Sequence, residues 1–355
     1  MAPHPKRDGN DRSTSVDARA RTDFLDHLFT KRLEIRGFAA GHRAVVAHHC
    51  LFLIAPHQPV SLRLEMLQVA RLAPKLLGND SAELIRTFLR AHLDATGAGL
   101  DRVGRPDLYY TMFVLAGLEG LQAEWPKACV ESYLLGFNDG ADLDFIHLGA
   151  LARCWAAIGC EKMPAGLAEN LLARIERHRS ADGGYDNEVG ARFGSSYGCF
   201  VAFGAAQDLR RALPDPLRMV QCLKLLETRD GAWANAHHLP VGSTNATAAA
   251  IILLRQLDLP INPAVAAWLI ARAHPDGGFR AAPSAPLPDL LSTATTLHAF
   301  AAMQIDLPER VRERCLDFVD TLWSATGGFH GHWADDDLDA EYTFYGLLAL
   351  GHLSL

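Results

Sequence analysis

The closing stretch of the sequence holds the side chains best suited to chemistry. Two histidines, His330 and His332, precede five carboxylates within seven positions; the carboxylates are Asp335, Asp336, Asp337, Asp339 and Glu341. Carboxylates this close repel one another at neutral pH. We therefore expect one of three arrangements: one member protonated with a raised pKa, a bound cation, or a well-solvated loop. If a cation binds, the hard oxygen ligands suit Mg²⁺, which could carry a diphosphate group.

The elements that must position these residues are helices. From Thr22 onward, apolar residues recur at steps of three and four, and no segment shows the alternation that is typical of a strand. Proline and glycine, as at Pro56, Pro59 and Gly78, separate the periodic stretches. The sequence therefore predicts an all-α fold.

A Gly-Gly-aromatic motif recurs at a nearly constant interval. Its four clear copies begin 48, 46 and 50 residues apart, with Ala in place of the second Gly in one copy; they are Gly183 to Tyr185, Gly231 to Trp233, Gly277 to Phe279 and Gly327 to Phe329. An interval of this length indicates an array of helical hairpins, each with an apolar face that only a neighbour can cover. We predict a closed α/α toroid of about six helical hairpins, with inner and outer rings of helices around a central cavity.

Each hairpin is expected to combine an apolar inner helix with an amphipathic outer helix. The predicted inner helices are 42–54, 107–121, 143–158, 194–209, 244–257, 289–304 and 340–354. The predicted outer helices are 62–76, 126–136, 163–180, 214–227, 262–273 and 308–323.

The N-termini of the inner helices should surround one mouth of the cavity. Counting ten residues from each aromatic residue of the motif gives Ser195, Ser243, Asp289 and Asp339, and counting twelve gives Tyr197, Asn245, Leu291 and Glu341. Asp107 and Asp289 could simply cap their helices. Aromatic residues of the inner helices could line the cavity and stabilise a cation by their π-faces; they include Tyr109, Tyr197 and Phe344.

These repeats resemble those shared by protein prenyltransferase β subunits, squalene-hopene cyclases and class II terpene cyclases. The resemblance rests on the Gly-Gly-aromatic turn, about ten residues of loop, an acidic residue and a threonine-bearing inner helix, and it covers about 100–355 well. The segment Pro288 to Ala294 aligns without gaps on the cyclases' Pro-Asp-x-Asp-Asp-Thr-Ala motif. The resemblance implies an α/α toroid whose central apolar cavity holds an isoprenoid chain.

The side chains that define the chemistry of these families are replaced at several positions. Leu291 stands where the cyclases have their proton-donating Asp, and Ser292 stands where the next Asp would be. Of the three zinc ligands of the transferases, only Asp289 has a counterpart, since Leu291 and Tyr342 stand in place of Cys and His, so zinc is not expected. In the last repeat, Glu341 occupies the position that is equivalent to the cyclase acid. It could be a proton donor kept neutral by apolar surroundings.

Two hypotheses follow from these observations. The first is a prenyltransferase-like or cyclase-like enzyme that acts on a long apolar isoprenoid, with Glu341, Asp339 and Asp289 as catalytic candidates. Its substrate-binding candidates are Asp335, Asp336, Asp337, His332, Tyr197, Asn245, Tyr109 and Phe344. The second is a non-catalytic toroid that binds a lipid, a peptide or a partner subunit, which a cavity filled by side chains would favour.

Composition narrows the class of protein further. With 355 residues and 49% hydrophobic content the chain can bury a large core, and its formal net charge of −7 does not support nucleic-acid binding. No stretch offers the roughly 18 apolar residues of a membrane span. Seven scattered cysteines without a CxxC pair favour reduced thiols in a cytoplasmic protein. We expect a disordered tail at 1–21 and a single toroid domain at 22–355.

Overall fold

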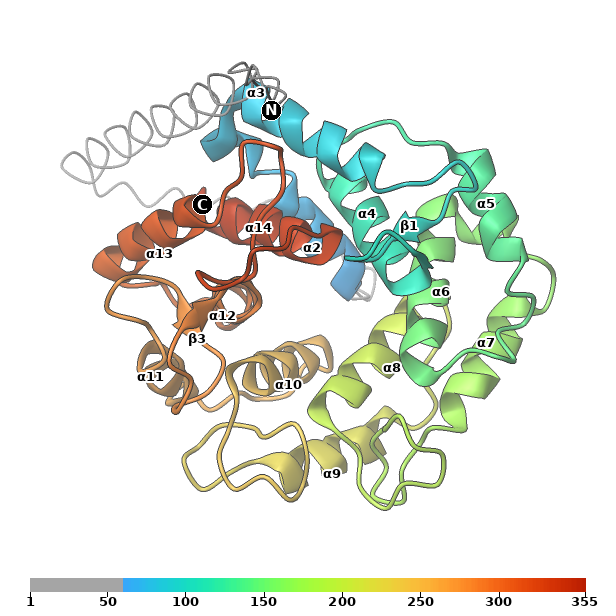
Figure 1. Ribbon diagram of the computed structural model, residues 1–355. Coiled ribbons are helices and arrows are strands. Elements are labelled where there is room, and N and C mark those ends of the chain that lie inside the picture. The colour runs from blue at the N-terminus through green and yellow to red at the C-terminus, as the bar shows by residue number, and fades with distance from the viewer. Residues whose placement is uncertain (1–59) are drawn as a thin grey trace, which may run out of the picture.

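The computed structural model describes residues 60–355, in which helices form a ring of two layers (Figure 1). The predicted tail at 1–21 and the predicted inner helix at 42–54 lie outside the described residues, as does the first part of the domain predicted for 22–355. No helix among residues 60–355 is long and apolar enough to cross a membrane.

Six helices of the described part form the inner layer: α4 (Leu108–Gly120), α6 (Phe145–Ile158), α8 (Ser196–Asp208), α10 (Thr244–Gln256), α12 (Leu290–Met303) and α14 (Ala340–Leu353). Six form the outer layer: α3 (Pro74–Ala91), α5 (Lys127–Leu135), α7 (Leu167–Glu176), α9 (Pro216–Leu226), α11 (Val265–Ile270) and α13 (Glu309–Thr321). Each inner helix packs against the next, and α14 packs against α4, so the ring is closed (Figure 1). The predicted α/α toroid of about six hairpins is therefore confirmed.

The core lies between the two layers of helices. The inner helices bury residues on most of their circumference, as α10 does, because they contact two neighbours and an outer helix. The outer helix α13 buries Cys315, Leu316, Phe318 and Val319 and exposes Asp317 between them. This contrast follows from the sequence pattern that distinguishes the two kinds of helix.

Each turn that carries the Gly-Gly-aromatic motif is tied to the inner helix that follows it. The backbone N–H of Phe279 donates to Thr293 Oγ1 at 2.9 Å, and that hydroxyl donates to the carbonyl of Asp289 at 2.7 Å. Thr343 makes the same pair of bonds in the last repeat, to the N–H of Phe329 (3.3 Å) and the carbonyl of Asp339 (2.6 Å). The motif therefore fixes where each inner helix begins.

Short strands precede two of the inner helices, although the sequence shows no strand pattern. The antiparallel pair β1 (Gly99–Leu100) and β2 (Pro106–Asp107) precedes α4, with Gly99 opposite Asp107. The pair β3 (Phe279–Arg280) and β4 (Pro288–Asp289) precedes α12, with Phe279 opposite Asp289. A 3₁₀ turn, Cys160–Lys162, joins α6 to α7.

The outer helix predicted at 62–76 is wrong, because this segment forms two elements. The first, α2 (Leu62–Ala70), packs against the inner helices α4, α8 and α14, and the outer position is taken by the second, α3. The sequence period of three and four residues is the same for a helix on either side of the ring, so it could not distinguish these positions.

Polar contacts place α2 across the C-terminal ends of the inner helices. The N–H of Leu62 donates to Gln207 Oε1 of α8 at 2.9 Å. Arg63 forms an ion pair of 2.6 Å with Glu119 near the end of α4, and Gln256, the last residue of α10, donates to the backbone just before α2 at 2.9 Å. The helix α2 thus closes this end of the cavity.

Candidate functional site

One residue from each inner helix lines the cavity near the N-terminal ends of the helices. The six N-cap side chains each accept a hydrogen bond from a backbone N–H in the first turn; they are Asp107, Asp144, Ser195, Ser243, Asp289 and Asp339. The prediction that Asp107 and Asp289 cap helices is confirmed. Two residues beyond each cap stands a cavity-lining residue; these six are Tyr109, Ile146, Tyr197, Asn245, Leu291 and Glu341. Of these six residues, Glu341 is the one that carries a carboxyl group.

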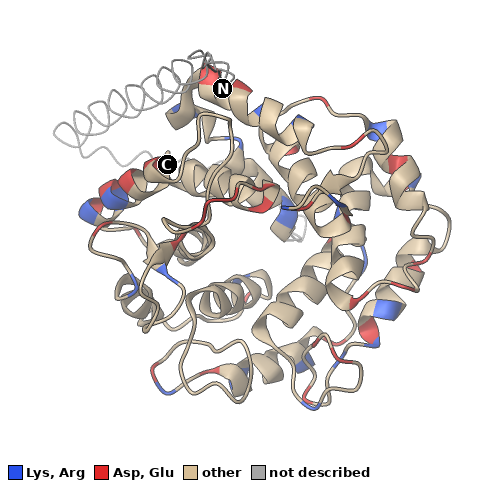
Figure 2. Ribbon diagram, viewed as in Figure 1, with Lys and Arg blue, Asp and Glu red and all other residues tan. Residues whose placement is uncertain are grey.

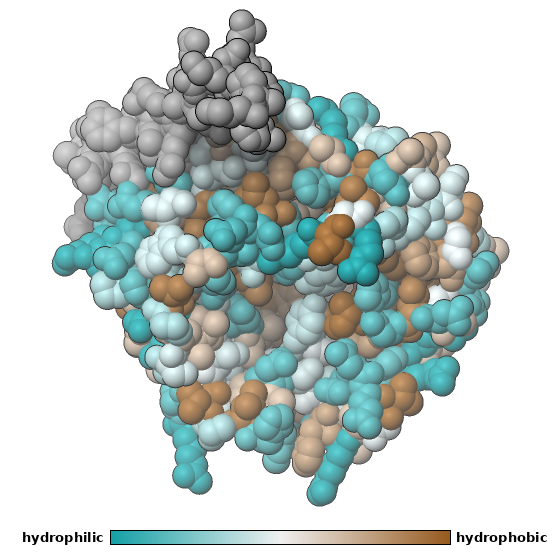
Figure 3. All heavy atoms as spheres, in the orientation of Figure 1, coloured by the Kyte–Doolittle hydropathy of each residue, from teal (hydrophilic) through white to brown (hydrophobic). Residues whose placement is uncertain are grey.

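The central cavity has two adjoining lobes. The larger lobe, about 270 Å³, contains Glu341, Asn245 and Leu291 in its wall, and the smaller lobe, about 80 Å³, extends toward α2. The two lobes share five lining residues: Met66, Tyr109, Tyr197, Phe200 and Tyr345. Figure 3 shows apolar surface in a recess near the middle of the face that surrounds the ring axis. The lining is apolar and aromatic with a few polar groups, as is usual for small-molecule sites.

The carboxyl group of Glu341 is held in this cavity by Tyr109. The Tyr109 hydroxyl donates to Glu341 Oε1 at 2.9 Å, and Tyr197 interacts with Tyr109 in turn. Burial raises the pKa of Glu341 to about 7, against the opposing effect of the Tyr109 hydrogen bond. The neighbouring Asp339 carboxylate raises this pKa further and the Arg102 guanidinium lowers it. Near neutral pH, Glu341 therefore exists partly as the uncharged acid.

This raised pKa should make the stability of the protein depend on pH. The folded protein holds the Glu341 proton up to about pH 7, whereas the unfolded chain releases it near 4.5, so the free energy of unfolding falls as pH rises between these values. When the pH rises from 5 to 8, the free energy of unfolding of the wild type should fall by about 2–3 kcal/mol more than that of Glu341→Gln. Urea unfolding of both proteins at the two pH values measures this difference. Equal pH dependence of the two proteins would contradict the burial of an ionisable Glu341.

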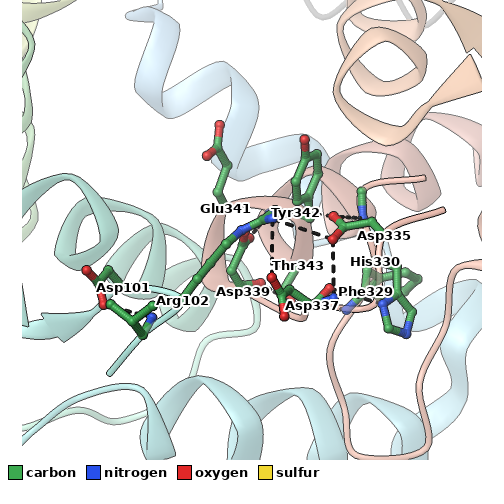
Figure 4. Close-up of polar contacts among 12 residues, drawn as sticks. Asp101, Arg102, Phe329, His330, Asp335, Asp337, Asp339, Glu341, Tyr342 and Thr343 are labelled. Atoms are coloured by element: carbon green, nitrogen blue, oxygen red, sulfur yellow. Dashed lines mark hydrogen bonds and ion pairs between the residues drawn. The ribbon is translucent and has the colours of Figure 1, made fainter. Parts of the chain in front are cut away.

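The acidic cluster surrounds an arginine from the first described repeat. Arg102, in the loop between β1 and β2, donates from Nε to Asp339 Oδ2 at 2.6 Å. Its terminal nitrogens reach Asp335 at 3.3 Å and Asp337 at 3.9 Å. Figure 2 shows the acidic stretch before α14 in red, and Figure 4 shows Glu341 pointing away from these ion pairs. Two of the three expected arrangements occur together: the cation beside the cluster is the Arg102 guanidinium, and Glu341 is the member with a raised pKa.

The other predicted site residues divide between the cavity and the loop. Tyr109, Tyr197, Asn245 and Phe344 line the cavity with Glu341, and Tyr197 keeps 43% of its surface exposed there. Asp336 is exposed on the loop, and His332 Nδ1 accepts from the backbone N–H of Ala334 at 3.1 Å.

Asp289 remains engaged as a cap. It accepts from the N–H and the hydroxyl of Ser292, both at 2.7 Å. Burial raises the pKa of Asp289, and the Ser292 bonds oppose this. Among residues 60–355 no group of three or more His, Cys, Asp and Glu side chains is arranged to hold a metal ion.

Removing Arg102 should open the junction between the first and last repeats. Asp339 is nearly fully buried, so the variant Arg102→Met leaves a buried carboxylate without its guanidinium. Because Arg102 itself is about one-third exposed, we expect a loss of about 2 kcal/mol in the free energy of unfolding. Denaturant titration measures the loss, and Arg105→Met, whose side chain is 77% exposed, is the matched control. Equal stability of the two variants would contradict the role of Arg102.

Residues 246–353 match the family model described as the prenyltransferase alpha-alpha toroid domain. This part of the chain is similar to that toroid family. The family resemblance predicted from the repeats is thereby confirmed. No curated protein matches the chain in sequence.

Solved structures show where the toroid fold recurs. Candida albicans protein geranylgeranyltransferase-I complexed with GGPP has a TM-score of 0.54 and 13% identity, covering 68% of this chain and 83% of that chain. A variant of the type II terpene cyclase MstE from Scytonema, in complex with its substrate geranylgeranyl dihydroxybenzoate, has a TM-score of 0.54 and 14% identity, covering 82% and 98%. A second variant of this cyclase, without ligand, has a TM-score of 0.53 and 13% identity over the same shares. At such identities the similarity shows the fold alone.

Three polar residues of the site were not predicted from the sequence: His298, Arg102 and Arg153. His298 lines the larger lobe, and its Nδ1 lies 2.9 Å from Nε2 of the buried His352. Burial lowers the pKa of His298 to about 4, so this imidazole is neutral. Arg102 gave no local indication of its role, since its partners lie more than 230 residues away. Arg153, by contrast, could have been noticed as a lone charge within an apolar inner helix.

Proposed function

We propose that the protein is a terpene cyclase-like enzyme in which Glu341 starts the reaction by protonating a double bond of an isoprenoid substrate. The observation that carries this proposal is a carboxyl group with a pKa of about 7 in an apolar cavity, hydrogen-bonded to Tyr109. A general acid works best when its pKa lies near the working pH. The relatives with this fold that are complexed with GGPP and geranylgeranyl dihydroxybenzoate support an isoprenoid as the substrate.

In this mechanism Glu341 transfers its proton to one carbon of the alkene, which leaves a carbocation on the other carbon. Further double bonds of the substrate attack the cation and close rings, and loss of a proton or capture of water ends the reaction. The rings of Tyr197, Phe200 and Tyr345 line the cavity and can stabilise the positive charge by their π-faces. Asp339, which stays with Arg102, keeps a negative charge beside Glu341 that favours its reprotonation.

A prenyltransferase-like reaction has less support from the side chains. Leu291 lines the cavity where a transferase would have its cysteine ligand, and Tyr342 packs against the Arg102 guanidinium, 5.3 Å from the ring centroid. Magnesium binding by the acidic loop stays a prediction. A magnesium ion would have to compete with Arg102, which already contacts three of the carboxylates of the loop. The hypothesis of a non-catalytic toroid expected a filled cavity, whereas the cavity is open and Glu341 lies in its wall.

The reaction can be tested in heavy water with a panel of C20 isoprenoids. A proton-initiated cyclisation should give a cyclic product that carries one deuterium from the solvent, and with geranylgeranyl diphosphate the diphosphate group should remain attached. Mass spectrometry of the extracted products detects both features. Release of diphosphate without deuterium uptake would favour a transferase-like reaction, and absence of any product from the whole panel would contradict the proposal.

A further inference from the structure

The end of the cavity opposite Glu341 contains a second polar group, the guanidinium of Arg153. This arginine lies on α6 and lines the smaller lobe, beside α2. Its Nε donates to Asp208 Oδ2 at 2.9 Å, and the Asp208 side chain is only 3% exposed. The guanidinium is thus held in one orientation by a buried carboxylate.

Arg153 lines the smaller lobe, and its hydrogen bond to Asp208 uses Nε alone. Among residues 60–355 no acceptor for either of its terminal nitrogens is found, although the side chain is only 19% exposed. Gly204 on α8 makes room for the group, because a Cβ at this position would lie 3.0 Å from Arg153 Nη2. A planar guanidinium with one edge fixed and the other free is suited to bind a carboxylate with two parallel hydrogen bonds.

We propose that the free edge of Arg153 binds the head group of the substrate, and that this head group is a carboxylate. The inference rests on the proposed function, because it assigns a place to the end of the isoprenoid that Glu341 does not protonate. Arg153 stands nine residues after the cap of its helix and Glu341 two, so their levels along the ring axis differ by roughly 10 Å. The cavity therefore orients an amphiphile, with the head toward α2 and the reacting alkene toward Glu341.

Charge and space at this end favour a single carboxylate over a diphosphate. Two ion pairs lie at or beside the smaller lobe: Arg153 with Asp208, and Arg63 with Glu119. When these four side chains are ionised, their charges sum to zero. Burial raises the pKa of Glu119, and a negative charge that enters beside it would raise this pKa further. A diphosphate would bring more charge than this site can balance, into a lobe of only about 80 Å³.

The proposal predicts a selectivity that binding measurements can detect without turnover. In the Glu341→Gln background, we expect geranylgeranoic acid to bind about tenfold more tightly than its methyl ester, geranylgeraniol or geranylgeranyl diphosphate. Replacing the ion pair by apolar residues, Arg153→Met with Asp208→Leu, should abolish this preference and leave the affinity for geranylgeraniol unchanged. The pair is replaced together because removal of Arg153 alone would leave Asp208 buried and unpaired.

A second variant separates charge from geometry. Arg153→Lys keeps the positive charge but lacks the planar fork, so we expect it to lose most of the preference for the acid. The inference is overturned if the double variant keeps the preference, or if the Glu341→Gln protein with Arg153 and Asp208 intact binds the alcohol or the diphosphate at least as tightly as the acid. Because Glu341 is replaced in all these proteins, the outcome does not depend on whether Glu341 is the proton donor.

Discussion

Replacing Glu341 by glutamine should lower the turnover of a cyclising substrate by about 10²–10⁴-fold, the usual contribution of a positioned general acid. Glutamine has nearly the same shape and can still accept the hydrogen bond that Tyr109 now donates to Glu341. The variant therefore removes the transferable proton while it preserves the wall of the cavity. Product formation over time, measured by gas chromatography, gives the ratio of rates for the two proteins.

The matched control for this experiment is Asp336→Asn. Asp336 belongs to the same acidic stretch but is exposed on the loop, so its replacement should leave turnover unchanged. The wild-type rate should also decline above about pH 7, where Glu341 loses its proton. Turnover of Glu341→Gln at the wild-type rate would show that another group supplies the proton.

Replacing Gly327 by alanine should destabilise the ring by about 3 kcal/mol or more. Gly327 has a φ of +100°, and a Cβ at this position would lie 2.2 Å from the carbonyl oxygen of Leu84 on α3. The substitution therefore combines an unfavourable backbone conformation with a collision at the contact between the last turn and the first outer helix. Urea unfolding at constant pH measures the loss.

The equivalent glycine of another repeat separates these two effects. Gly231 has a φ of +80°, but nothing lies within 4 Å of a Cβ placed on it. The variant Gly231→Ala should therefore lose only about 1–2 kcal/mol, the cost of the backbone conformation. A loss of the same size in both variants would mean that close packing at Gly327 does not hold the ring together.

The parts of the fold that repeat could be predicted from the sequence. The recurring Gly-Gly-aromatic motif sets the interval of the repeats. In three of its four copies, a threonine of the next inner helix accepts from the N–H of the aromatic residue; these are Thr247, Thr293 and Thr343. Counting from the motif also placed Tyr197, Asn245, Leu291 and Glu341 at equivalent positions, and all four line the cavity. Local spacing was sufficient here because every repeat solves the same packing problem.

The parts that occur once could not be predicted in this way. The position of α2 depends on contacts with Glu119, Gln207 and Gln256, which a helical period does not encode. For the acidic cluster, the local sequence offered a protonated carboxyl group, a bound cation such as magnesium, or a solvated loop. It could not indicate an arginine, because Arg102 comes from a different repeat. The raised pKa of Glu341 depends on burial, which follows from closure of the ring.

Closure by α14 also determines when the ring can form during synthesis. Arg102 and Asp339 are 237 residues apart, and Tyr109 and Glu341 are 232 residues apart. At roughly 5–20 residues per second, the ribosome needs on the order of 10–50 s to add the second member of each pair. Through that interval α4 lacks α14, the neighbour that covers one of its sides. The candidate acid is made long after Tyr109, its hydrogen-bond partner, and the cavity becomes chemically competent only once α14 has been added.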